Sequence, residues 1–359
     1  MMCDDCAHGT TRTSRQWLLG VTLLAASAIV VSAVLWPEQV AVGWLIGLVV
    51  TISVSVGSLA WLQIHCLTGG RWGVALRPVL VPAACCTPVL ALLFMPLLMY
   101  LPGLYQWADD PSTIEAAVRA WYLNPDAFTA RTAIALSGWS ILALLTVRRT
   151  NGAGVLLAAL GLVFHAVSIS YISIDWILSM APGFISTSFG FSFAIMQLLA
   201  ALAYAALVRP ADDRRALHDH AALLLCTTLA LAYISFMAVL VLWYGNRPSK
   251  VAWLVTRSRA PWSWMTMIAL ALACLLPACA LLDARLRSSR KALRVLGAGV
   301  LVGLMLNVMV LLGAPHGLAS TVVAVFATLT LLGGLALVIV ARPPSIWRAA
   351  TPARRRPSS

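Results

Sequence analysis

Two ionisable residues, His165 and Asp175, stand out because they could exchange protons in an otherwise apolar part of the sequence. His165 lies inside an apolar run over 152–172, and Asp175 follows shortly after it. An ionisable side chain inside a span costs about 2.5–3.5 kcal/mol on insertion scales, so it should face protein or a cavity. The spacing of His165, Ser168, Ile172 and Asp175 can place all four on one helix face. They predict a titrating site; the alternative is a histidine bonded to a backbone carbonyl of a neighbouring helix.

The run DWILSMAPGFISTSFG at 175–190 separates two long apolar stretches. Its first two residues put a carboxylate beside an indole, Asp175-Trp176, which is typical of the boundary between water and lipid, and Tyr171 lies near the same end. A Pro-Gly pair should then stop or bend the helix. We therefore expect an extracytoplasmic helix–loop–helix here and no carboxylate within any span.

The composition indicates a multi-pass membrane protein. Of 359 residues, 61% are hydrophobic and 10% are charged, whereas a soluble domain has about 25% charged residues. The net charge of +13 could suggest nucleic-acid binding. However, the basic residues lie in short loops between apolar stretches and in the C-terminal tail, so we expect no nucleic-acid partner and contact with lipid instead.

Ten stretches satisfy the requirement of about 20 apolar residues per membrane crossing. The predicted spans are 17–36, 40–64, 79–103, 127–147, 152–172, 184–208, 221–244, 262–282, 293–313 and 319–341. The prediction is an all-α integral membrane protein with a cytoplasmic tail at 1–16, a ten-helix domain at 17–341 and a basic cytoplasmic tail at 342–359. The first span is too long for a signal peptide and has no small-residue cleavage site, so we expect it to be retained.

The distribution of basic residues predicts the orientation. If both termini are cytoplasmic, the inner segments hold 19 of the 25 Lys and Arg residues and the outer segments hold six. Positive charge accumulates on the cytoplasmic side of membrane proteins, so this bias favours an even number of spans with both termini inside.

No intrinsic metal or haem is predicted. The tail contains Cys3, Cys6 and His8, but Ala7 interrupts a haem-attachment motif and nothing nearby supplies a fourth zinc ligand. A b-type haem needs two axial ligands at one depth on facing helices, and no two histidines meet that condition.

Two polar turns could either anchor the chain in the headgroup region or contact a partner. The first comprises His65, Gly69, Gly70, Arg71 and Trp72, and the second comprises Trp243, Tyr244, Gly245 and Asn246. Between them, the third span carries several prolines, whose missing N–H groups leave carbonyls that neighbours must satisfy, so we expect a kinked helix inside the bundle. The last two spans are nearly pure Leu, Val, Ala and Gly. They are predicted to be a lipid-facing scaffold in which Gly297 and Gly303 permit close contact.

Five short stretches follow in a characteristic order: HCLTGGRWG at 65–73, LYQWA at 104–108, WYLNPDAF at 121–128, DWILSMAPGFISTSFG at 175–190 and LWYGNRP at 242–248. Together they resemble the ActF-type membrane subunits of bacterial alternative complex III, which belong to the NrfD-like polysulfide-reductase membrane family. The chain departs from the family at Ser179–Phe184, which lacks an acid and a histidine, and at the basic residues Arg247 and Lys250.

The resemblance implies an NrfD-like helical bundle in the bacterial plasma membrane, within a quinol:cytochrome c oxidoreductase of the respiratory chain. The chain would support quinone binding, complex assembly and possible proton transfer. Its partners would be an NrfD-like quinol-binding subunit, an iron–sulfur subunit and a multihaem cytochrome c, which carry the haem c and the clusters. The quinone or proton site would comprise His165, Tyr171, Asp175 and Trp176. The alternatives are a standalone secondary transporter and a membrane anchor or assembly factor.

Overall fold

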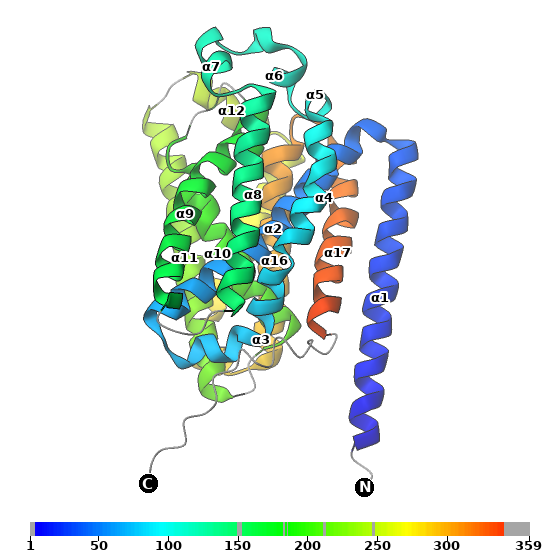
Figure 1. Cartoon of the computed structure of the whole chain (residues 1–359), viewed down its shortest axis with the longest axis vertical. Helices are drawn as coiled ribbons and strands as arrows, with labels where there is room; N and C mark the ends of the chain where they lie inside the picture. Colours follow the sequence, from blue (N-terminus) through cyan, green and yellow to red (C-terminus); the bar gives the residue numbers. More distant parts are fainter. Residues whose placement is uncertain are drawn as a thin grey trace.

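The computed structural model describes residues 4–340 except 149–152, 182, 183, 185, 211, 212, 246 and 247, and the described residues form helices with no strand (Figure 1). The helices are α1 (Asp4–Leu35), α2 (Pro37–Thr68), α3 (Arg71–Cys85), α4 (Thr87–Met99), α5 (Leu101–Leu104), α6 (Gln106–Asp109), η1 (Pro111–Thr113), α7 (Ala116–Trp121), α8 (Pro125–Arg148), α9 (Ala153–Trp176), η2 (Leu178–Met180), α10 (Phe189–Val208), α11 (Arg214–Gly245), α12 (Pro248–Ser258), α13 (Trp262–Leu270), η3 (Ala271–Leu275), α14 (Leu276–Ala280), α15 (Ala284–Arg287), α16 (Arg290–Gly313) and α17 (Leu318–Val340).

Ten helical segments within the described residues are long and apolar enough to cross a membrane. They are α1 from Arg15 onwards, α2, α3 with α4, α8, α9 with η2, α10, α11, α13 with η3 and α14, α16, and α17. The predicted fold class, an all-α protein with ten spans, is therefore confirmed. The start of α1 and the end of α17 lie at one end of the bundle, the terminal end; α5 to α7 and α12 lie at the opposite loop end (Figure 1).

The helix α2 occupies the centre of the bundle. Nearly every residue over 42–63 is buried, and α2 packs against α3, α9, α10 and α17. Small residues permit this packing, because helix association in lipid depends on close approach of the backbones. A Cβ atom added to Gly57 would lie 2.0 Å from the carbonyl oxygen of Gln197 on α10, and one added to Gly47 would lie 2.7 Å from the Cβ of Ala327 on α17.

The third predicted span is broken between α3 and α4, next to the proline at position 88. Pro88 has no N–H for the carbonyl of Ala84, and the hydroxyl of Thr87 donates to that carbonyl at 2.7 Å. Ser55 of α2 donates to the carbonyl of Ala83 at 2.7 Å. The carbonyl freed by Pro88 is therefore satisfied from within its own span, and a neighbouring helix reaches only the adjacent Ala83 carbonyl. The prediction of a helix inside the bundle holds for α3 but only in part for α4, which has an exposed face.

The prediction that the last two spans form a lipid-facing scaffold holds only in part. Half of the apolar stretch of α16 and half of that of α17 are buried, because α16 packs on α10 and α13 while α17 packs between α1 and α2. The predicted close contacts at the glycines are confirmed: a Cβ on Gly297 would lie 2.5 Å from the carbonyl oxygen of Ala203, and one on Gly303 would lie 2.7 Å from the backbone nitrogen of Ala273.

Among the ten candidate spans of the described residues, α1 has the smallest buried share, and it lies at the edge of the bundle (Figure 1). Trp17, Leu24 and Val34 are strongly exposed. The main contact of α1 is with α17, where a Cβ atom on Gly333 would lie 2.4 Å from the hydroxyl oxygen of Thr22.

Candidate functional site

Three sequence stretches meet at the loop end: two that are close in the chain, 104–108 and 121–128, and one that follows much later and begins at Asp175. The hydroxyl of Tyr105, from LYQWA, donates to the carbonyl of Trp176 at 3.2 Å, and its ring lies 5.2 Å from that of Phe128. The ring of Trp176 stacks on Phe94 with a centroid distance of 4.4 Å. Burial raises the pKa of Tyr105 and of Tyr122 well above the usual value for a phenol, so both remain protonated at neutral pH.

The polar centre of this cluster is an ion pair between α8 and the end of α9. Nε of Arg131 donates to one carboxylate oxygen of Asp175 at 2.7 Å, and Nη2 donates to the other at 3.0 Å. Nη2 also donates to the carbonyl of Tyr122 at 2.9 Å, and the guanidinium lies 4.1 Å from the centre of the Tyr122 ring. The bidentate geometry satisfies a carboxylate that is fully buried.

The expected water–lipid boundary at Asp175-Trp176 is therefore wrong. These two residues do end α9, but both are 0% exposed. The indole Nε1 of Trp176 donates to the hydroxyl of Thr132 at 3.1 Å, inside the protein. Asp175 lies near the end of the 27-residue candidate span from Gly154 to Met180, so the expectation that no carboxylate lies within a span stays a prediction.

The predicted buried face of α9 is confirmed, since His165, Ser168, Ile172 and Asp175 are all buried. However, His165 and Asp175 are not partners. They are ten residues apart on one helix, which corresponds to about 15 Å at 1.5 Å per residue. The imidazole lies 6.1 Å from the ring of Trp139 on α8, whereas Asp175 pairs with an arginine.

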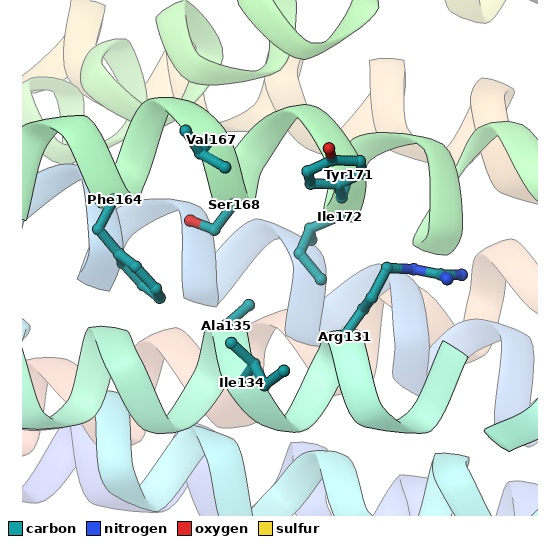
Figure 2. A pocket seen from close by; sticks show the side chains of 8 residues that line it. All are labelled: Arg131, Ile134, Ala135, Phe164, Val167, Ser168, Tyr171 and Ile172. Atoms are coloured by element: carbon teal, nitrogen blue, oxygen red, sulfur yellow. The ribbon is translucent and has the colours of Figure 1, made fainter. Parts of the chain in front are cut away.

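A groove of about 340 Å³ lies between α8 and α9, at the lower limit of the volumes of small-molecule sites (Figure 2). Its lining is Arg131, Ile134, Ala135, Phe164, Val167, Ser168, Tyr171 and Ile172. Figure 2 shows Phe164 at one end and Arg131 at the other, with Ser168 and Ile172 directed from α9 towards α8. Of the predicted quinone or proton residues, only Tyr171 lines the groove.

Two buried glutamines were missed by the sequence prediction. Gln63 on α2 and Gln197 on α10 are almost fully buried, and neither amide has a partner among the described residues. A Cβ atom on Gly161 of α9 would lie 2.2 Å from Nε2 of Gln63. Because Gly161 precedes His165 by one helical turn, this amide lies within roughly 8 Å of the His165 Cβ. The sequence did contain a signal for both residues, because each is a polar amide side chain inside an apolar span.

The first predicted turn is held by internal contacts. Nε2 of His65 lies 2.9 Å from the carbonyl oxygen of Gly70, and the imidazole packs edge-on against Trp72 at 5.1 Å. Gly69 and Gly70 have φ of 69° and 100°, which side chains disfavour. Arg71 begins α3 directly after these two glycines.

The second predicted turn presents aromatic rings outwards. Trp243 and Tyr244 are strongly exposed at the end of α11, 5.7 Å apart, as an aromatic belt requires. Gly245 is the last residue of α11, and Asn246 lies outside the described residues.

No three His, Cys, Asp or Glu side chains in the described part of the chain are grouped to hold a metal ion. Cys3 and the side chains of Cys6 and His8 are not within that part. Among known proteins, no family model matches the chain, and no curated protein is significantly similar to it.

Proposed function

We propose that the chain is an integral membrane subunit of a bacterial quinol:cytochrome c oxidoreductase of the alternative complex III type, with both termini in the cytoplasm. The main support is the convergence of three of the five resemblance stretches on one buried cluster beside the α8–α9 groove. Apolar helices are enough to cross a bilayer, and they do not need these three stretches to meet in one buried cluster. The cluster therefore favours a functional site at this place.

In this proposal the groove receives the quinone or quinol. The surface that lines the groove is almost entirely apolar, which suits an isoprenoid tail. The quinone head would lie at the end of the groove marked by Arg131 (Figure 2), whose Nη1 group can donate a hydrogen bond to a quinone oxygen. Redox chemistry would be supplied by the quinone and by the haem c and iron–sulfur clusters of partner subunits.

The ion pair Arg131–Asp175 would position the site rather than exchange protons with the quinone. It ties the start of α8 to the end of α9 and so fixes the width of the groove at that end. His165 lies outside the groove, near the unpartnered Gln63 amide, and would serve proton movement only through that separate polar region.

The test is purification of the tagged full chain from its host, followed by measurement of quinol-dependent cytochrome c reduction. We expect multihaem cytochrome and iron–sulfur subunits to co-purify. Val167→Trp, which adds bulk at the exposed edge of the groove, should raise the KM for quinol roughly tenfold with the complex intact. Leu156→Trp, an exposed position of the same helix outside the groove, should leave KM unchanged.

Isolation of the chain without haem or iron–sulfur subunits would contradict the proposal, as would equal KM values for the two tryptophan variants. The standalone transporter then becomes the stronger hypothesis, because the break between α3 and α4 and the unpartnered Gln63 and Gln197 are features of a transport site. Solute flux into liposomes containing only this chain would test it.

A further inference from the structure

A second charged feature lies at the terminal end of the bundle, away from the groove. Between α14 and the first turns of α16 the chain carries five basic residues, which we call the basic rim: Arg285, Arg287, Arg290, Lys291 and Arg294. The carboxylate nearest in sequence, Asp283, caps α15 by accepting the Arg285 N–H at 2.8 Å. The segment therefore has a large excess of positive charge.

Much of this charge is uncompensated and accessible. Arg285, Lys291 and Arg294 are exposed, and Arg287 is partly exposed. None of these four forms an ion pair with a carboxylate of the described chain. Nε of Arg287 is shielded from solvent and lacks a hydrogen-bond partner within the same part of the chain. An anion would therefore contact the accessible part of this guanidinium rather than its Nε.

The basic rim does not gain net charge from the start of α11, which packs against α15. Arg214 and Arg215 are exposed there, but Asp213 and Asp219 of the same stretch offset them. The N-terminus of α16 lies within the basic rim, and its helix dipole adds partial positive charge there. The only capping side chain of α16 is the neutral Ser289, whose hydroxyl accepts the Ala292 N–H at 3.3 Å.

Exposed apolar side chains border the basic rim. Leu275, Leu276 and Leu282 precede it, and Val295 follows it directly. The surface thus changes from apolar to strongly basic within one or two helical turns. A phospholipid has the complementary form, with acyl chains that pack on apolar side chains and a phosphate that pairs with Lys and Arg.

A nucleic acid fits this surface less well. Proteins that bind single strands combine basic grooves with aromatic side chains on which bases stack, and residues 281–296 contain no aromatic side chain. Exposed leucines beside the charges are also unsuited to a fully solvated acidic polymer.

We propose that the basic rim is a binding site for the headgroup of an anionic phospholipid of the surrounding membrane. Arg287, Lys291 and Arg294 bind the phosphate, and the acyl chains lie along Leu275, Leu282 and Val295. This site is independent of the proposed quinone groove, because it lies at the opposite end of the bundle.

The test uses the full chain in detergent and measures retained lipid by native mass spectrometry after addition of phosphatidylglycerol or phosphatidylcholine. The wild-type chain should retain more phosphatidylglycerol than phosphatidylcholine. A variant with Arg285→Gln, Arg287→Gln, Lys291→Gln and Arg294→Gln should lose at least roughly tenfold in affinity, since each basic residue near a membrane surface contributes about fivefold. The matched control, Arg119→Gln with Arg259→Gln, removes two exposed charges at the loop end and should retain the preference.

A charge-conserving variant, Arg285→Lys with Arg287→Lys and Arg294→Lys, separates charge from folding and should retain most of the binding. Equal retention of the two lipids by wild type would overturn the proposal. The proposal would also be overturned if the lysine variant lost the preference for phosphatidylglycerol as the glutamine variant does. Displacement of the lipid by inorganic phosphate or by an oligonucleotide at equal charge concentration would overturn it as well.

Discussion

The contact of α2 with α10 and the contact of α8 with α9 differ in how closely the helix backbones approach. At Gly57 the backbones of α2 and α10 are so close that a methyl group does not fit. Between α8 and α9, larger side chains keep the helices apart and leave the groove, which the ion pair Arg131–Asp175 closes at one end. We therefore interpret the contact of α2 with α10 as a rigid scaffold. We interpret the groove between α8 and α9 as a place where a membrane-soluble molecule can enter.

The largest expected effect comes from breaking the ion pair. Asp175→Asn leaves Arg131 without its counter-charge in a largely buried place, so we expect a loss of about 3 kcal/mol in the free energy of unfolding. Unfolding in detergent, followed by tryptophan fluorescence, would measure this loss. The double variant Asp175→Leu with Arg131→Met should recover a large part of it, because the remaining charge is removed. The control Asp126→Asn, an exposed carboxylate at the start of α8, should change stability by less than about 0.5 kcal/mol.

The next effect tests the α2–α10 contact. Gly57→Ala puts a methyl group against the Gln197 carbonyl, and overpacking of this kind costs about 1–3 kcal/mol. Gly334→Ala, where nothing lies within 4 Å, should leave stability unchanged or slightly higher because alanine favours the helix. Equal melting temperatures for the two variants would show that α2 and α10 separate easily, which would contradict a rigid contact between these two helices.

The smallest effect concerns the indole that joins the same two helices. Nε1 of Trp61 donates to the carbonyl of Leu198 at 3.0 Å. Trp61→Phe should cost about 1 kcal/mol, since it removes one hydrogen bond and leaves most of the ring packing. The same unfolding measurement applies. A loss as large as that of Asp175→Asn would mean that the Trp61 indole contributes as much to the free energy of unfolding as the ion pair does, contrary to this expectation.

The spans could be predicted from the sequence because the thickness of the bilayer fixes the length of an apolar run. The buried face of α9 followed from the spacing of His165, Ser168, Ile172 and Asp175 in the same direct way. The partner of Asp175 did not follow, since Arg131 lies 44 residues away and an Asp-Trp pair looks the same at a headgroup boundary and inside a bundle.

The roles of the last helices could not be predicted from composition. Lipid tails are as apolar as leucine, so a run of Leu, Val, Ala and Gly does not distinguish a helix that faces lipid from one that faces protein. The spacing of small residues, as at Gly297 and Gly303, carried more information than hydrophobicity. Gln63 and Gln197 were missed because the search for a site considered titratable side chains and not neutral amides. An unpartnered amide in an apolar core is also costly, although less so than an unpaired charge.

The pairing of α1 with α17 has a consequence for biogenesis. Because a chain is synthesised from its N-terminus, α1 is made before α17, its main neighbour. Until α17 follows, the α17-facing side of α2, including Gly47, is also uncovered. The growing chain therefore passes through a state in which its central helix lacks one neighbour and that side must contact lipid or another protein.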